Sequence, residues 1–247
     1  MFDIQSATSI INIITLLMVY LFSITIAGFI KAYVAHRMGD ETATDLGFLS
    51  LNPMAHFDFI GAFLLLLFGF GWGRFIPVNP FNIHGVWRRA KLTAAYLADA
   101  GVHLAIALIS LILLVVIFGL QVLIVANPMI LSGYLSHATL AQLYTESSSL
   151  SITFAFLLIA MAFFNVFLGV LDLLINGFGL GMVLFALRET QGDEQDMQSK
   201  IYEMYGHYLV FIIPIVLIFF FAGPLRYLVV YMMSIIGYGV AHLTGGI

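Results

Sequence analysis

The chain has 247 residues, of which 62% are hydrophobic and only 9% are charged, and its mean hydropathy is +1.07. Because water-soluble domains carry about 25% charged residues, this composition excludes a soluble domain and indicates an integral membrane protein. The formal net charge of −4 and the nine scattered basic residues exclude the basic stripe that nucleic-acid binding needs. The chain has no cysteine, so disulfides and thiolate zinc sites are excluded, and any metal would need His, Asp or Glu ligands.

Long uncharged runs predict several membrane-spanning segments. Only helices and closed barrels satisfy their backbone groups in lipid, and these runs are continuously apolar rather than alternating, so an all-α integral membrane bundle is expected. Six to seven transmembrane helices are predicted, at residues 8–34, 59–72, 94–126, 150–175, 177–189, 201–222 and 227–243.

Two of the apolar segments, Phe59–Trp72 and Gly177–Leu187, are short for a full crossing, so each is expected to be tilted, re-entrant or buried against its neighbours. The first run, from Ile4 to Ile30, is longer than the apolar region of a signal peptide and follows no basic residue. We therefore expect a retained first span.

Residues 1–247 are expected to form a single polytopic domain, multi-pass in a bacterial inner membrane or an organellar inner membrane. The loop Gly73–Lys91 holds four basic residues and no acid, whereas residues 121–150 hold no Lys or Arg. The first of these loops is therefore the predicted cytoplasmic one. The acidic stretch Arg188–Glu203 is expected to be a solvated excursion or the start of the next helix.

Three stretches carry a specific pattern. Residues 27–40 read AGFIKAYVAHRMGD, residues 46–61 read LGFLSLNPMAHFDFIG, and residues 71–80 read GWGRFIPVNP. In this order they resemble the site-2 protease family of intramembrane zinc metallopeptidases, in its small form. That family carries Ala-(Tyr/Trp)-Val-Ala with a Leu-Gly-Asp turn, then Leu-x-Leu-Asn-Pro-x-x-His-x-Asp-x-x-Gly, then Gly-Trp-x-(Lys/Arg)-Pro-Val-Pro-Val-Asn-Pro; here Met38 replaces the Leu of the turn. The resemblance covers residues 25–185 and implies a site-2-protease-like bundle, to which residues 201–247 would add C-terminal helices.

The resemblance also locates the family's zinc-binding helix, where His-Glu-x-x-His precedes Ala-(Tyr/Trp)-Val-Ala. Two imidazoles at positions i and i+4 share a helical face and grip the zinc, while the Glu handles the proton of its bound water. Counted back from residues 32–35, Ala27 stands at the first ligand position, Gly28 at the general-base position and Lys31 at the second ligand position. The methyl group of Ala27, the hydrogen of Gly28 and the ammonium of Lys31 can neither bind a zinc ion nor accept a proton from its water. The chain is therefore expected to be a pseudoprotease with no catalytic residue and no zinc.

The family's third ligand is an Asp in Asn-x-x-Pro-x-x-x-Leu-Asp-Gly. Residues 165–177 read NVFLGVLDLLING, so an ungapped match puts Leu173 at that position and a single gap would restore Asp172. The family's Ala-Gly-Pro-x-x-Asn on the middle helix is likewise eroded, to AGVHLA at residues 100–105. The substitutions fall on the positions of the family's metal-binding and catalytic residues, whereas much of the surrounding architecture is kept.

Four ionisable residues form a candidate polar cluster inside the bundle, namely Lys31, Asp99, His103 and Asp172. Charged groups in a membrane are costly and usually find partners. Lys31 is expected either to replace the metal's charge by pairing with Asp172 or Asp99, or to snorkel to the interface. Asp99 and His103 are four residues apart on one helical face, a spacing that suits a structural hydrogen bond or a metal site.

A second set of residues is interpreted as architectural and consists of Asn52, Pro53, His56, Asp58, Gly61, Pro77, Asn79 and Pro80. The Asn52–Pro53 pair is typical of a turn, and a metal site formed by His56 with His36 or His84 is the alternative. Gly177 and Gly181 have the spacing that permits close helix packing.

These patterns together predict a catalytically inactive scaffold or partner-binding subunit of a membrane complex. Its partners are the lipid bilayer and other membrane subunits, which it would contact through transmembrane helix packing. Two alternatives stay open. One is an active zinc metallopeptidase with ligands relocated to Asp99, His103, Asp172 or His56, and the other is a channel or small-solute transporter, although no inverted repeat is apparent.

Overall fold

The computed structural model describes residues 7–68, 71–132, 140–141, 149–190, 193–205, 224, 227, 230–240 and 242–243. Within these ranges every regular element is a helix, which confirms the all-α prediction for this part of the chain. In chain order the helices are α1 (Ala7–Arg37), α2 (Thr42–Asp45), α3 (Pro53–His56), α4 (Phe59–Phe68), α5 (Arg88–Phe118), α6 (Gln121–Ser132), α8 (Ser149–Glu189) and α9 (Glu194–Tyr205). A further short apolar helix covers Val230–Val240.

Three described helices are long and apolar enough to cross a membrane, over Ile10–Arg37, Arg88–Phe118 and Leu150–Glu189. They correspond to α1 and α5, with 31 residues each, and to α8, with 41 residues. A crossing takes about 20 residues, so all three extend beyond the hydrocarbon layer. The count of six to seven crossings stays a prediction, because most of the expected span at 201–222 falls outside the described residues.

The predicted break between spans 150–175 and 177–189 is wrong, since α8 continues without interruption through Gly177 and Gly181. A glycine costs a helix only about 1 kcal/mol, which the packing of a long apolar helix outweighs. A β-carbon at Gly177 or Gly181 would meet no atom within 4 Å. These glycines therefore do not mark a close helix contact among the described residues.

The other predicted spans also differ from the structure at their ends. The span predicted at 94–126 is divided between α5 and α6 at Gly119, whose φ of +76° lies in the left-handed region that favours glycine. Helix α4 ends after 10 residues and is too short to cross. Within the acidic stretch after Arg188, helix α9 begins at Glu194.

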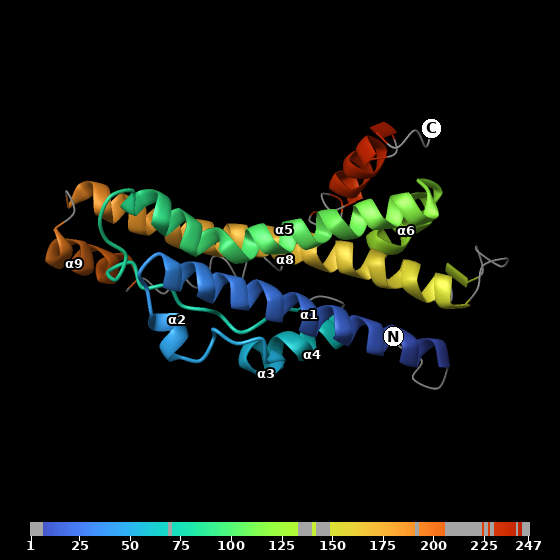
Figure 1. Cartoon of the computed structure of the whole chain (residues 1–247), viewed down its shortest axis with the longest axis horizontal. Coiled ribbons are helices and arrows are strands. Elements are labelled where there is room, and N and C mark those ends of the chain that lie inside the picture. The colour runs from blue at the N-terminus through green and yellow to red at the C-terminus, as the bar shows by residue number, and fades with distance from the viewer. Residues whose placement is uncertain are drawn as a thin grey trace.

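The three long helices lie side by side and form the body of the molecule (Figure 1). Helix α5 runs antiparallel to α1 and α8, so the C-terminal ends of α1 and α8 meet the start of α5 at one end of the bundle. One apolar core joins α5, α6 and α8, and a second joins α1, α4 and α8. Helices α3 and α4 lie along the outer side of α1.

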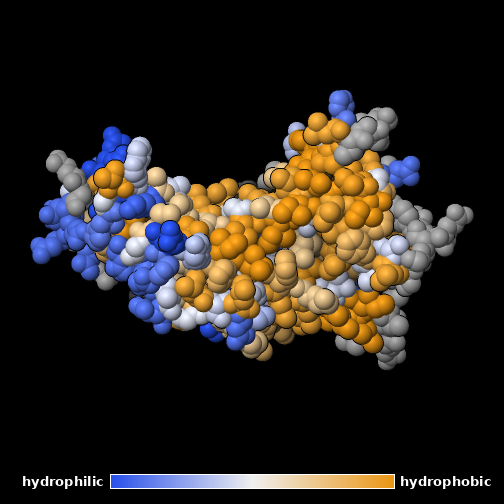
Figure 2. Space-filling model, viewed as in Figure 1, coloured by the Kyte–Doolittle hydropathy of each residue, from blue (hydrophilic) through white to orange (hydrophobic). Residues whose placement is uncertain are grey.

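Polar residues concentrate at the end of the bundle where α9 lies, whereas most of the remaining visible surface is apolar (Figure 2). Helix α9 packs there through Met197 and Ile201 against residues of α5 and α8. Six of the nine basic residues belong to the helix ends that meet there or to α9; they are Arg37, Arg88, Arg89, Lys91, Arg188 and Lys200. The cytoplasmic placement of the loop before α5 stays a prediction.

Candidate functional site: a polar cavity between three long helices

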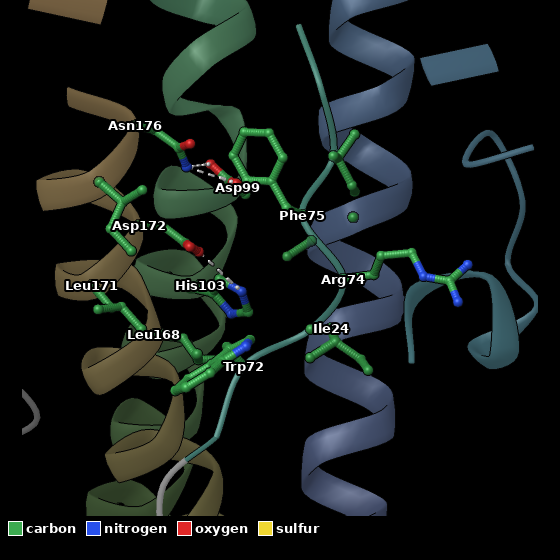
Figure 3. Close-up of a pocket in the computed structure, with 15 residues that line it drawn as sticks. Ile24, Trp72, Arg74, Phe75, Asp99, His103, Leu168, Leu171, Asp172 and Asn176 are labelled. Atoms are coloured by element: carbon green, nitrogen blue, oxygen red, sulfur yellow. Dashed lines mark hydrogen bonds and ion pairs between the residues drawn. The ribbon is translucent and has the colours of Figure 1, made fainter. Parts of the chain in front are cut away.

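A cavity of about 310 Å³ lies between α1, α5, α8 and the extended segment that precedes α5 (Figure 3). Its lining is mainly apolar and includes a few polar residues, which is typical of ligand-binding sites. Two of the three degenerate motif positions, Ala27 and Gly28, line it from α1. Its polar lining residues are Arg74, Asp99, His103, Asp172 and Asn176.

Contacts with the backbone of Asp58 and Trp72 hold the start of the extended segment in place. The hydroxyl of Tyr20 lies 3.1 Å from the carbonyl oxygen of Asp58 and 3.0 Å from that of Trp72. The backbone of Gly61 approaches Trp72 so closely that a β-carbon at Gly61 would overlap it. The start of the segment is therefore in contact with both α1 and α4.

The buried carboxylate of Asp40 fixes the other end of the segment. One of its oxygens accepts a hydrogen bond from the backbone N–H of Asn79 at 2.7 Å, and the other accepts from Nδ2 of Asn82 at 2.8 Å and Oγ1 of Thr42 at 2.6 Å. Asp40 has no exposed surface. The turn after α1 and the segment ahead of α5 are thus joined through one side chain.

Lys31 lies inside the bundle and is paired with Asp99. Its Nζ is 2.7 Å from Oδ2 of Asp99, and only 2% of the lysine side chain is exposed. Asn176 donates to the same carboxylate oxygen at 3.0 Å, and the ring centroid of Phe75 lies 5.5 Å from Nζ. The ammonium charge is therefore neutralised within the protein rather than at the membrane surface.

His103 links the cavity to a chain of buried polar groups. Its Nδ1 is 2.8 Å from Oδ1 of Asn165, whose Nδ2 donates to Oγ of Ser23 at 2.8 Å and to the carbonyl of Met161 at 2.9 Å. Its Nε2 lies 3.5 Å from Oδ2 of Asp172. Three residues of the predicted cluster, Asp99, His103 and Asp172, thus line one cavity, and the fourth, Lys31, is paired with Asp99.

His56 packs beside Gly28 on the outer side of α1. Its imidazole is 1% exposed, and its Nε2 lies 2.8 Å from the carbonyl oxygen of Ser50. A β-carbon at Gly28 would overlap Nδ1 of this ring. Burial lowers the pKa of His56 below its ordinary value, the charge of Arg74 acts in the same direction, and the hydrogen bond to Ser50 opposes them.

The other predicted metal partners of His56 lie in separate ion pairs. His36 is 2.7 Å from Glu41, and His84 is 3.2 Å from Glu194. Both pairs are exposed. Neither histidine joins His56 in a group of three metal-ligating side chains in the part of the chain that the structure describes.

The remaining residues of the architectural set shape the loops around α3 and the extended segment. Oδ1 of Asn52 accepts from the N–H of Met54 and caps α3, where Pro53 takes the first helical position. Oδ1 of Asp58 accepts from the N–H of Gly61 at 2.7 Å. Asn79 accepts from Phe81 at 3.1 Å, and the carbonyl of Pro80 accepts from Arg88 at 3.2 Å. Pro77 stands in the extended segment between these contacts.

The side chains present do not fit the zinc ion that the resemblance implies. Ala27 and Gly28 offer no donor atom, and the paired ammonium of Lys31 adds a positive charge that repels a cation. Across residues 7–68, 71–132, 149–190 and the other described ranges, no three His, Asp or Glu side chains lie close enough to hold a metal.

Three polar residues of the site were not predicted from the sequence. Asn165 and Asn176 are buried on α8 and complete the contacts of His103 and Asp99, and Ser23 does so from α1. Buried Asn and Ser in an apolar run are a signal for such contacts, since an unpaired amide in lipid is costly.

Comparison with known proteins yields a partial match. Over 105 residues the chain is 38% identical to the protein named "Putative zinc metalloprotease YwhC" of Bacillus subtilis (strain 168). The match covers 41% of this chain and 46% of that relative, so it spans less than half the length of either. No protein-family model and no solved structure matches the chain. The relative's name agrees with the resemblance to zinc metallopeptidases read from the motifs.

Proposed function

We propose that this chain is a catalytically inactive, site-2-protease-like membrane protein that binds a partner in the bilayer without cutting it. The observation that carries the proposal is the 2.7 Å ion pair between Lys31 and Asp99, beside a cavity lined by Ala27 and Gly28. The resemblance puts a zinc ion and its general base at these positions. At these positions the chain has instead the buried ammonium group of Lys31 and, at Ala27 and Gly28, no donor atom.

Replacement of a zinc ion by the ammonium of Lys31 would remove the hydrolytic chemistry but keep a positive charge at the site. A zinc ion lowers the pKa of its bound water to about 7 and so supplies a nucleophile at neutral pH. An ammonium is not a Lewis acid, and Gly28 has no side chain that could accept the proton. The ammonium still neutralises Asp99, whose carboxylate would otherwise be an unpaired charge among apolar helices.

The surface around the site is suited to contact with lipid or another helix. Phe75, which lines the cavity, is 67% exposed, and Leu173 and Leu174, which follow Asp172, are 46% and 55% exposed. Exposed apolar groups of this kind are covered by lipid or by a neighbouring transmembrane segment. Retained architecture around lost ligands favours a binding role for the fold.

Two measurements on the purified full chain test the proposal. Extraction with native lipids, followed by mass spectrometry of intact complexes, is expected to show another membrane protein at fixed stoichiometry. An assay with labelled transmembrane peptides in zinc-containing buffer is expected to show no cleavage above a protein-free control. A chain that remains a monomer under mild extraction and cleaves peptides would contradict the proposal.

An active zinc metallopeptidase is the alternative. The name of the Bacillus relative favours it, and so does the approach of His103 on α5 to Asp172 on α8, because both are metal-ligating side chain types that line the same cavity. Stoichiometric zinc in the purified chain would favour this alternative over the inactive form.

A further inference from the structure

Two apolar side chains project from the turn just before α5. Val86 and Trp87 are 77% and 78% exposed. Trp87 also has a φ of +67°, in the left-handed region that a bulky residue rarely adopts. Packing within the described part of the chain does not account for this conformation, because most of the surface of Trp87 is exposed. The turn therefore presents an aromatic side chain to its surroundings.

The length of α5 places this turn at the level of the lipid headgroups. Helix α5 is a candidate membrane span of 31 residues, and at about 1.5 Å per residue it is about 46 Å long. A bilayer is about 40–45 Å thick with its headgroup regions included, so each end of α5 is expected in a headgroup layer. Trp87 directly precedes α5, and tryptophan is enriched at this depth because its ring is apolar and its N–H can donate.

Three cations lie beside the exposed tryptophan. Arg88, Arg89 and Lys91 belong to the first turn of α5, and none of them is in an ion pair with a described residue. Arg88 and Lys91 donate to backbone carbonyl oxygens at 3.2 and 3.1 Å, and these neutral acceptors leave both charges uncompensated. Helix α9 brings Glu194 to this end of the bundle, but that carboxylate is paired with His84. The turn therefore combines exposed apolar surface with uncompensated positive charge.

We propose that residues 86–91 bind the headgroup of an anionic phospholipid of the surrounding bilayer, with Trp87 in the headgroup layer and Arg89 on the lipid phosphate. The guanidinium of Arg89, an exposed residue, carries N–H donors in a planar fork that matches phosphate oxygens. Arg88 and Lys91 add positive charge around it. A zwitterionic lipid carries a cation of its own, whereas a lipid such as phosphatidylglycerol has the net negative charge that complements the turn.

This inference goes beyond the proposed function, because it depends neither on the cavity nor on the loss of peptidase activity. Its ligand belongs to the bilayer in which an apolar chain of this kind is embedded. Failure of the lipid site would leave the proposed function unaffected.

Fluorescence quenching in nanodiscs tests the site with the full chain. The chain has two tryptophans, so the Trp72→Phe variant keeps Trp87 as its single indole. The nanodiscs contain phosphatidylcholine and phosphatidylglycerol, and one of the two lipids is brominated on its acyl chains at equal bromine content. Bromine quenches an indole that contacts the labelled lipid. Brominated phosphatidylglycerol is expected to quench Trp87 more strongly than brominated phosphatidylcholine.

The Arg89→Gln variant is expected to lower this preference about fivefold, which corresponds to about 1 kcal/mol for one basic residue at an anionic surface. Arg37→Gln removes the same charge from the exposed last residue of α1 and is the matched control that should retain the preference. The difference in quenching between the unmodified chain and Trp87→Phe gives the same quantity without a change at Trp72.

Equal quenching by the two brominated lipids would overturn the assignment to an anionic headgroup. Quenching by iodide in the buffer but by neither lipid would show that the turn faces water, and protection from iodide and both lipids would show that protein covers it. Either result would overturn the lipid site. Equal loss of the preference in Arg89→Gln and Arg37→Gln would also overturn it, because the preference would then reflect the overall charge of the chain.

Discussion

The imidazole of His56 lies in the space beside Gly28 that a side chain at that position would need. His56 is held there by burial and by its contact with the carbonyl oxygen of Ser50. The resemblance assigns the general base of the protease family to position 28. Its loss and the packing of the α3 loop against α1 are therefore linked in this structure.

Substitution of Gly28 by alanine should destabilise the protein by about 1–3 kcal/mol, the usual cost of overpacking a filled core. Thermal unfolding in detergent measures the effect. Gly101→Ala is the matched control in α5, because a β-carbon there meets no atom within 4 Å. It should be neutral or stabilising, since alanine favours a helix over glycine.

Gly28→Ala should lower the free energy of unfolding by less when His56 is also replaced by alanine, because the new β-carbon then has room. Equal costs in the two backgrounds would show that His56 does not limit position 28.

Removal of one partner of the buried pair should be strongly destabilising. Lys31→Met leaves Asp99 as an unpaired carboxylate, and Asp99→Asn leaves an unpaired ammonium, at a cost of about 3–5 kcal/mol each. The double variant should lose less than the sum, because no unpaired charge remains. Unfolding of the four proteins under one condition gives the coupling energy, and strict additivity would mean that the two charges do not stabilise each other.

His56 should make stability depend on pH. Its pKa is lowered in the folded protein, so the unfolded chain takes up its proton first as the pH falls. The stability from neutral His56 is fully present above its ordinary pKa of about 6.5 and is lost as the pH falls through the lower folded value. The melting temperature of His56→Gln should fall less between pH 7 and pH 5 than that of the wild type, and parallel curves would contradict this assignment.

Tyr20→Phe should loosen the extended segment along the cavity. Its hydroxyl contacts the carbonyls of Asp58 and Trp72, and loss of a buried hydrogen-bond partner costs about 1–3 kcal/mol. Hydrogen exchange should increase around residues 71–76. Tyr33→Phe, at a position 46% exposed, is the control, and equal exchange in the two variants would rule out this tether.

Much of the fold could be predicted because apolar runs in lipid must be helical. Helix ends were harder to predict. The break predicted between residues 175 and 177 is absent from α8, whereas Gly119, inside the predicted span 94–126, ends α5 because its backbone adopts a positive φ.

Only part of the site could be predicted from the sequence. The pattern could place Lys31, Asp99 and Asp172 within apolar runs, but which side chains meet depends on the rotation of three helices about their axes. The roles of Asn165 and Asn176 depend on the same rotations, and the course of the extended segment depends on tertiary contacts of Asp40 and Tyr20. Sequence periodicity does not contain this information.

Zinc content of the purified chain distinguishes a catalytically inactive protein from a zinc metallopeptidase. The chain is expressed in zinc-supplemented medium, extracted without chelators and measured by plasma mass spectrometry against protein concentration. Zinc is expected far below one ion per chain and unchanged by later chelation, because Ala27 and Gly28 offer no donor atom and the proposal puts the ammonium of Lys31 in place of the metal. About one zinc per chain, removable by a chelator and required for peptide cleavage, would contradict it.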